Sequence, residues 1–134
     1  MAPGGRTIYV GDRQNSVVRR IQINLNSVDT VVGRVKACPE GAECKKLMGL
    51  SFGVALDTNK NLYYVDNGNV IIGKVNLTTM DINQSFSGRG VNGSVDGAAS
   101  QCQYSSARFL KYFNGYLYVA ESATGLVRQI DMEG

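Results

Sequence analysis

The chain of 134 residues contains no histidine, no tryptophan and only two prolines. Without histidine, a serine or cysteine nucleophile would need another base, and zinc could be bound only by cysteines and carboxylates. The apolar runs are strand-sized and fall short of the roughly 20 residues of a membrane-spanning helix, so we expect no membrane insertion. These absences exclude several classes of enzyme, and we expect a non-enzymatic chain without a cofactor or a metal.

Charge is also sparse and scattered. Lys and Arg number 14 against 11 Asp and Glu, which gives a net charge of +3. Binding to a phosphate backbone needs several basic groups on one face, but here the basic residues are dispersed along the chain and only folding could gather them. Nucleic acid is therefore a weakly supported partner, and an RNA-binding role stays open as an alternative.

The chain has three cysteines. Cys38 and Cys44 bracket a short loop that a disulfide could close, which leaves Cys102 over; a redox or metal site is the alternative. A disulfide would favour a secreted protein or one in the endomembrane lumen over a cytoplasmic one. Asn-x-Ser/Thr triplets, the glycosylation pattern of that compartment, begin at Asn76, Asn83 and Asn92. The first five residues lack the basic start and apolar stretch of a secretory signal.

One strand–turn–strand pattern occurs three times, at 7–12, 62–67 and 116–121, and each copy is followed by a second apolar run that contains a basic residue. Tyr9, Tyr64 and Tyr118 recur at a spacing of about 55 residues. Sixteen glycines suit many short strands joined by tight turns. A fixed period of this length indicates stacked or radially repeated β-units.

Alternation of apolar and polar residues between turn signals predicts about ten strands and almost no helix. The middle unit, 50–88, is complete, with four antiparallel strands that we label A to D. The first unit, 7–33, lacks strand A, and the last, 107–133, lacks strand D. Asn114-Gly115 is the strongest hairpin signal, because both residues tolerate positive φ. The expected strands are 7–12, 17–25, 28–32, 52–57, 62–66, 70–77, 80–87, 108–113, 116–121 and 126–132.

At these residues the chain resembles the NHL-repeat β-propellers. Their pattern is a Gly-rich loop, a Leu-Tyr-Val-Ala-Asp-like strand, a polar turn with Asn and an Ile-Arg-x-Ile-like strand. The matching segments are Tyr9-Val10-Gly11-Asp12, Val18-Arg19-Arg20-Ile21, Leu117-Tyr118-Val119-Ala120-Glu121 and Val127-Arg128-Gln129-Ile130. The departures are Gly73-Lys74 in the middle unit, Glu121 and Thr124 in the third, and a Cys-bearing insertion in the first long loop.

The resemblance implies an all-β fold, a β-propeller segment of four-stranded antiparallel blades, with residues 1–134 forming one partial propeller. A closed propeller has roughly four to eight blades, and this chain holds between two and three. We therefore expect a segment of a longer propeller, or a subunit that completes itself by self-association as a homodimer.

Three sets of recurring residues each leave two interpretations. The acidic residues could meet in a calcium site or, as we prefer, stabilise turns. The basic residues of the third strand could form a ring that holds an anion, or pair with the acid of the preceding strand. The tyrosines could form a stacking platform or the core between blades. These sets are Asp12, Asp66, Asp96 and Glu121; Arg19, Lys74 and Arg128; and Tyr9, Tyr64 and Tyr118.

Because successive strands are antiparallel, the D-to-A and B-to-C connections should emerge on one face, which then carries the long loops at 34–49 and 89–106. Binding residues concentrate on loops held by a rigid scaffold, so we place a protein or peptide partner there. An alternative is a fragment of a propeller enzyme, lyase-like or hydrolase-like, whose catalytic groups lie outside this chain. The residues expected on the binding face are Arg13, Asn15, Asn67, Asn69, Arg89, Asn92 and Thr124.

Overall fold

The computed structural model of the chain describes residues 6–33 and 50–132. This part is nearly all β, with ten antiparallel strands in three sheets and no α-helix. None of its elements is a helix long and apolar enough to cross a membrane. Cys38 and Cys44 lie outside the described residues, so the predicted disulfide stays a prediction.

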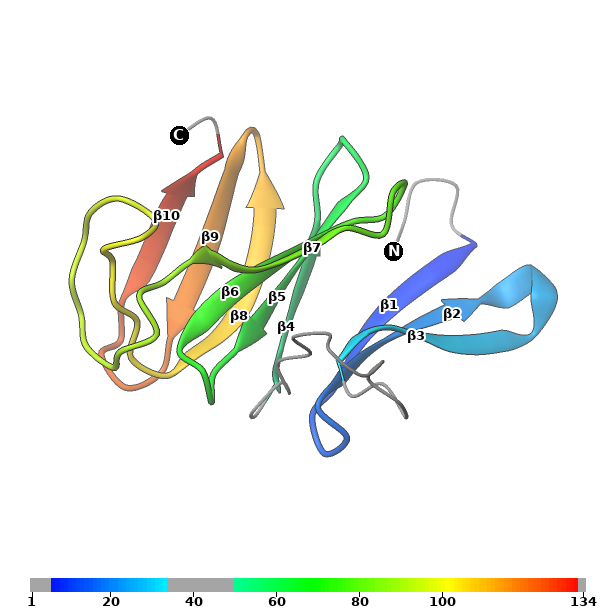
Figure 1. Cartoon of the computed structure of the whole chain (residues 1–134), viewed down its shortest axis with the longest axis horizontal. Helices are drawn as coiled ribbons and strands as arrows, with labels where there is room; N and C mark the ends of the chain where they lie inside the picture. The colour runs from blue at the N-terminus through cyan, green and yellow to red at the C-terminus, as the bar shows by residue number, and fades with distance from the viewer. Residues whose placement is uncertain (1–5, 34–49, 133–134) are drawn as a thin grey trace, which may run out of the picture.

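The sheets follow one another along the chain and stand side by side (Figure 1). The first has the order β1-β2-β3, the middle β4-β5-β6-β7 and the third β10-β9-β8. This is the predicted succession of an incomplete, a complete and an incomplete four-stranded unit. The strands are β1 (Thr7–Asp12), β2 (Val17–Gln22), β3 (Ser27–Gly33), β4 (Leu50–Leu56), β5 (Asn61–Asp66), β6 (Ile71–Asn76), β7 (Ile82–Ser87), β8 (Ala107–Phe113), β9 (Tyr116–Glu121) and β10 (Val127–Asp131).

Strand ends differ from expectation at one informative place. The predicted strand 17–25 ends at Gln22 and continues as the short 3-10 helix η1 (Ile23–Leu25), because Asn26 takes the left-handed conformation with φ of 48° and closes the turn. The Asn-Gly hairpin is confirmed: Asn114 and Gly115 have φ of 49° and 85°, the pair of positive angles that a tight hairpin turn requires.

The pairing registers identify corresponding positions in the three sheets. One set of opposed pairs is Tyr9–Arg20, Tyr63–Lys74 and Tyr118–Gln129. The sequence spacing had pointed to Tyr64 as the middle tyrosine of this set, and that assignment is wrong. Tyr64 is opposite Gly73 and corresponds to Val10 and Val119. Since side chains alternate along a strand, the shift of one residue places Tyr64 on the other face of the sheet.

Each sheet has a front face and a back face. In the middle sheet, the front face carries Leu62, Tyr64 and Val75, and the back face carries Tyr63, Val65 and Ile72. The corresponding front-face residues are Ile8, Val10 and Ile21 in the first sheet and Leu117, Val119 and Ile130 in the third. The corresponding back-face residues are Tyr9, Gly11 and Val18 in the first sheet and Tyr118, Ala120 and Val127 in the third.

The core lies between the sheets, in two clusters. In one, Val18 on the back of the first sheet packs with Leu62 and Tyr64 on the front of the middle sheet. In the other, Ile72 on the back of the middle sheet packs with Val119 on the front of the third. Removal of these side chains from water is the main stabilisation of the array. Both contacts therefore join the back of one sheet to the front of the next.

Gly73 is required by the ring of Tyr64. A Cβ atom at position 73 would overlap the end of that ring, and Tyr64 is 0 % exposed, so the ring has no room to move. At the corresponding position the first and third sheets have the large and small residues exchanged: a valine takes the place of the tyrosine, and an arginine takes the place of the glycine opposite it. Within the described residues, the hydroxyl of Tyr64 is buried without a hydrogen-bond partner. Tyr64 therefore contributes volume rather than polar contacts.

Substitutions of Tyr64 and Gly73 test whether the size of one side chain limits the size of the other. Gly73→Arg should destabilise the fold by about 1–3 kcal/mol through overpacking, and Tyr64→Val should cost about 2–4 kcal/mol through the cavity it leaves. The double variant recreates the pair of the neighbouring sheets, so its loss should be smaller than the sum of the single losses by at least about 0.5 kcal/mol. Chemical denaturation of the four proteins measures this coupling; strict additivity would contradict the account.

Asp57 stabilises the turn between β4 and β5 in the middle sheet. Its carboxylate accepts hydrogen bonds from the backbone N–H of Asn59 (2.8 Å) and Asn61 (2.9 Å), from the Asn61 side chain (2.8 Å) and from the Tyr63 hydroxyl (3.0 Å). Burial alone would raise the pKa of Asp57, but these hydrogen bonds to the ionised form outweigh it and hold the pKa below its ordinary value of 3.8.

A carboxyl whose pKa is lower in the folded than in the unfolded state stabilises the fold above the unfolded value, and this contribution is lost as the pH falls through the folded value. Asp57→Asn should therefore lower the free energy of unfolding by about 1–2 kcal/mol at neutral pH. Thermal melts between about pH 5 and pH 3 should show the gap between wild type and variant narrowing towards acid. A gap that stays constant would mean that the charge of Asp57 does not stabilise the turn.

Candidate functional site

Three short turns lie at one end of the array, at the bottom in Figure 1, and one long connection reaches the same end and also runs up beside β10. The turns are 13–16, 67–70 and 122–126, and the connection is 88–106; together we call them the turn face. This is the face on which antiparallel order predicts the B-to-C and D-to-A connections. It is the candidate functional site, because it gathers the longest described loop and most of the polar side chains singled out in the sequence.

The turns share one design in which an acidic residue ends a strand and a polar residue follows three positions later. Asn15 donates from its side chain to Asp12 (2.8 Å), and Asn69 donates to Asp66 (2.6 Å). The Thr124 hydroxyl donates to the Glu121 carboxylate (3.1 Å). The preferred interpretation of the acids as turn formers is confirmed for Asp12, Asp66 and Glu121.

The ion pair expected between the third strand and the preceding acid is present in two of the three sheets. Arg19 reaches Asp12 at 3.4 Å, and Arg128 reaches Glu121 at 3.4 Å. The side chain of Asp12 is partly exposed, and the hydrogen bond from Asn15 is the main reason that its pKa lies below the ordinary value. In the middle sheet Gly73 stands where Arg19 and Arg128 stand in the others.

Lys74 belongs to a different position, opposite Tyr63, and makes a different contact. Its Nζ lies 6.0 Å from the centre of the Tyr63 ring and 5.7 Å from that of Phe86. The two rings pack together with their centroids 5.2 Å apart. The three recurring basic residues therefore do not occupy equivalent positions and do not form a ring of cations. Two of them form ion pairs with a carboxylate of their own sheet, and the third lies near aromatic rings.

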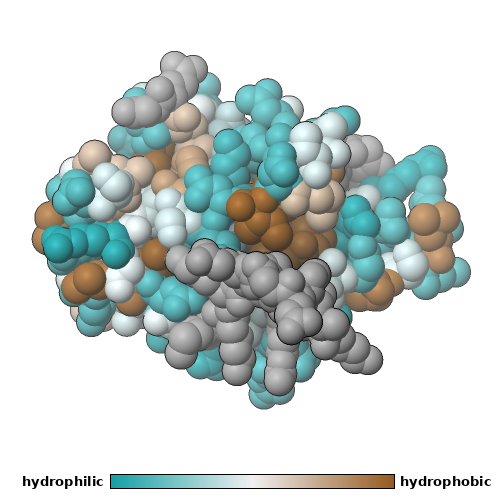
Figure 2. Space-filling view, viewed as in Figure 1, coloured by the Kyte–Doolittle hydropathy of each residue, from teal (hydrophilic) through white to brown (hydrophobic). Residues whose placement is uncertain are grey.

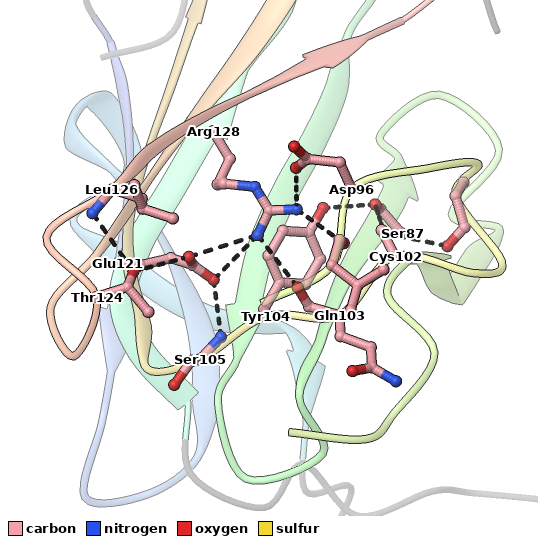
Figure 3. Close-up of polar contacts among 12 residues, drawn as sticks. Ser87, Asp96, Cys102, Gln103, Tyr104, Ser105, Glu121, Thr124, Leu126 and Arg128 are labelled. Carbon is pink, nitrogen blue, oxygen red and sulfur yellow. Dashed lines mark hydrogen bonds and ion pairs between the residues drawn. The ribbon is translucent and has the colours of Figure 1, made fainter. Parts of the chain in front are cut away.

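Arg128 holds the long connection against the third sheet (Figure 3). Its guanidinium donates to the carbonyl oxygens of Val95 (2.9 Å) and Gln103 (3.1 Å) and pairs with Asp96 at 2.6 Å. The guanidinium also lies 5.4 Å from the centre of the Tyr104 ring. Burial alone would lower the pKa of Arg128, but the hydrogen bond to Asp96 and the charge of Glu121 outweigh it and raise the pKa.

The buried carboxylate of Glu121 also receives a donor from the connection itself. The backbone N–H of Ser105 donates to it at 2.7 Å, and its side chain is 0 % exposed. Arg128, Thr124 and this N–H thus all donate to the same carboxylate. Hydrogen bonds to an ionised group are stronger than those between neutral groups, and burial strengthens them further. The end of the connection is thereby fixed to the turn of the third sheet.

Further hydrogen bonds fold the connection back upon itself. Gly88 donates from its N–H to Ala99 (2.9 Å), and Arg89 donates to the carbonyl of Cys102 (2.9 Å). Val95 and Gln103 form an antiparallel bridge. Gly88 and Gly90 have φ of 110° and 79°, which side chains rarely adopt, so the glycines there permit the reversal. The long loop is an ordered wall of the turn face.

Cys102 is buried, and within the part of the chain that the structure describes its thiol forms no disulfide. Its thiol lies 3.4 Å from the hydroxyl oxygen of Ser87, which in turn lies 2.7 Å from that of Tyr104. Burial raises the pKa of the Tyr104 hydroxyl. Across residues 6–33 and 50–132, no group of three or more His, Cys, Asp or Glu side chains could hold a metal ion. The thiol therefore belongs to the buried contacts that join the connection to the end of β7.

A groove of about 690 Å³ runs along β10, from Leu126 at the turn face to Met132 at the other end of the strand. Its opposite wall is the end of β7 and the connection, with Ser87, Asp96, Ala99 and Tyr104. Arg128 and Asp96 both line it, so the residues that anchor the connection also border the groove.

The predicted binding-face residues all lie on the turn face but differ in what they do. Asn15, Asn69 and Thr124 are engaged with the carboxylates of their own turns. Arg13, Arg89 and Asn92 are exposed, and Asn67 is half-buried. The sequence analysis missed the groove and the anchoring role of Arg128. The repeated pairing of an arginine with a strand-end acid was the available signal, whereas its contacts with Val95 and Gln103 depend on how the connection folds.

Comparisons with known proteins give the fold. No family model and no curated protein sequence matches the chain. Among solved structures, a protein of unknown function from Bacteroides thetaiotaomicron matches with a TM-score of 0.75 and 19 % identity over 92 % of this chain and 32 % of that one. An auxiliary nutrient binding protein from the same organism matches with a TM-score of 0.74 and 14 % identity over 96 % and 35 %.

A nidogen/laminin complex also matches, with a TM-score of 0.64 and 15 % identity over 99 % of this chain and 41 % of the matched chain. This chain thus spans 32 % to 41 % of the length of the three matched chains. With the three antiparallel sheets packed back to front, the likeness establishes an all-β fold of β-propeller type, as a segment of blades.

The anchoring role of Arg128 can be tested against Arg19, its counterpart in the first sheet. Arg128→Met leaves the buried Glu121 charge without its cation and should cost about 3–5 kcal/mol. Arg19→Met removes a partly exposed pair and should cost about 0–1 kcal/mol. Hydrogen exchange should show faster exchange at Val95 and Gln103 in the first variant only. Equal losses of stability and unchanged exchange would show that Arg128 does not hold the connection.

Proposed function

We propose that the chain is a non-enzymatic interaction module of NHL-repeat type, which binds a protein or peptide segment in extended form along β10 at the turn face. The observation that carries this proposal is the groove beside β10. The central strands β2 and β6 each have an outer neighbour, β3 and β7, but β10 has β9 on one side and the groove on the other.

A strand with one neighbour presents a row of backbone N–H and C=O groups to its open side. An extended peptide can satisfy them by adding a strand, and pockets for alternate side chains then give selectivity. The groove supplies such pockets, since Phe86, Ile130 and Met132 border it together with the polar Ser87, Asp96 and Arg128. We infer a ligand with apolar residues at alternate positions.

The middle sheet shows what such a ligand resembles. By register, β7 pairs with β6 at Ser87 opposite Ile72 and at Ile82 opposite Val75, and Val127 and Ile130 are the corresponding residues of β10. Strand β7 carries Phe86 towards Tyr63 and is followed by a glycine. A segment with an aromatic residue two positions before a glycine is therefore the type of occupant that fits.

Two of the matched structures bear descriptions that concern binding, one as a nutrient binding protein and one as a complex with laminin. They share only the fold with this chain, and they support binding as the kind of role. A folded partner that carried the extended segment would also lie over the exposed Arg13, Arg89 and Asn92.

A labelled synthetic peptide with the sequence of residues 82–88 is the probe for this proposal. Fluorescence anisotropy should show saturable binding to the intact chain. Ala99→Arg, which places a long side chain in the groove wall, should weaken binding by about tenfold or more. Ala123→Arg is the matched control, because Ala123 is exposed on the turn face outside the groove lining, and it should leave affinity unchanged.

Three altered peptides identify the binding mode. Replacing the peptide's phenylalanine by alanine should weaken binding by about tenfold, and N-methylation at alternate positions should abolish it in one register but not in the other, since only one set of N–H groups would face β10. No binding of the parent peptide, or equal affinity for both N-methylated forms, would overturn binding by strand addition.

A further inference from the structure

Within residues 6–33 and 50–132, the two ends of the array carry sheet faces that no other sheet covers. The front of the first sheet points away from the middle sheet, and so does the back of the third, at opposite ends of the molecule in Figure 1. In the space-filling view, separate groups of brown apolar residues reach the surface at both ends, among teal and white ones (Figure 2). Apolar side chains that gather on one exposed sheet face mark an interaction site in soluble proteins.

Corresponding positions show that these faces have the character of interior ones. On the front faces, Val10 is 39 % exposed, whereas its counterparts Tyr64 and Val119 are both 0 % exposed. On the back faces, Val127 is 70 % exposed, whereas Val18 and Ile72 are both 0 % exposed. Each position is apolar in all three sheets, while its exposure to solvent differs.

The back of the third sheet extends this apolar surface with aromatic rings. Phe109 is 57 % exposed and Phe113 is 64 % exposed. By register they lie on the same face as Tyr116 and Tyr118, whose ring centroids are 6.4 Å apart. Aromatic side chains of this kind dominate the energetics of protein interfaces.

We propose that the back of the third sheet binds the front of the first sheet of a second copy of this chain. The chain itself carries both members of the pair, and its two internal interfaces are both of this back-to-front kind. Each exposed end face would thus be covered by the other kind of end face from a second copy. That copy would stand where a fourth sheet of the same chain would stand. This proposal does not depend on the peptide groove.

A contact between two different faces is heterologous, so it closes into a ring or continues as an open chain. The first, middle and third sheets of two copies would make a ring of six, within the roughly four to eight blades of closed propellers. We therefore expect a two-copy ring with two identical interfaces, in which each copy contributes one front face and one back face.

Two charge substitutions and their mixture test the arrangement. Val10→Asp blocks the front face, and Val127→Asp blocks the back face. Light scattering across a concentration series should give a two-copy mass for the wild type and a one-copy mass for each variant alone. An equimolar mixture of the variants should regain a two-copy mass, because the intact back face of one meets the intact front face of the other.

Leu25→Asp is the matched control, since Leu25 is 68 % exposed but lies in η1, outside both faces, and this variant should associate like the wild type. Recovery in the mixture also shows that both face variants are folded. A wild type that stays monomeric at every concentration overturns the proposal. So does a single variant that still dimerises alone, which would indicate like faces in contact.

Discussion

Back-to-front packing of sheets is the constraint on which the rest of this structure depends. A single sheet of three or four short strands buries little on its own, and here each apolar face is covered only by the next sheet. Val18 of the first sheet packs on the front of the middle sheet, and Val119 of the third packs on its back. The middle sheet is therefore covered on both faces and is the most buried of the three described sheets. All six residues of β5 are buried. Stability is therefore shared between neighbours, as in other repeat architectures.

The same constraint explains how the turn face is made. Antiparallel strands of similar length bring the three turns to one end, and each turn is closed by its own carboxylate. In the third sheet, the carboxylate and its arginine also reach outward to the connection that leads in from the middle sheet. The pair that forms this turn thus also anchors a long loop, and that loop forms one wall of the groove beside β10.

Much of the fold was predictable from the sequence, because period-2 alternation, the Asn-Gly hairpin and the recurrence of the strand pair all report on local geometry. The succession of incomplete, complete and incomplete units follows from them. The face of Tyr64 was not predictable from spacing, since a difference of one residue in loop length moved the apparent repeat by one position. The pairing registers show that Tyr63, which stands three residues before Asp66 as Tyr9 stands three before Asp12, is the counterpart of Tyr9.

The candidate site was less accessible to sequence reasoning. The Asp and Asn residues of the turns were identified, because their interaction is local. The contacts of Arg128 with Val95 and Gln103 join segments far apart in the chain and depend on the path of the connection. The groove has no sequence signature of its own, because its walls come from β7, the connection and β10, which only folding brings together.

The pairing of Tyr64 with Gly73 also bears on how such repeats can change over time. Genes that encode tandem repeats exchange segments by unequal recombination, which works when the units are interchangeable. A crossover between the β5 and β6 coding segments would join a tyrosine strand to an arginine strand, or a valine strand to a glycine strand, and so overfill or empty the same position. The middle unit can therefore be exchanged only whole, because a break between β5 and β6 would separate Tyr64 from Gly73.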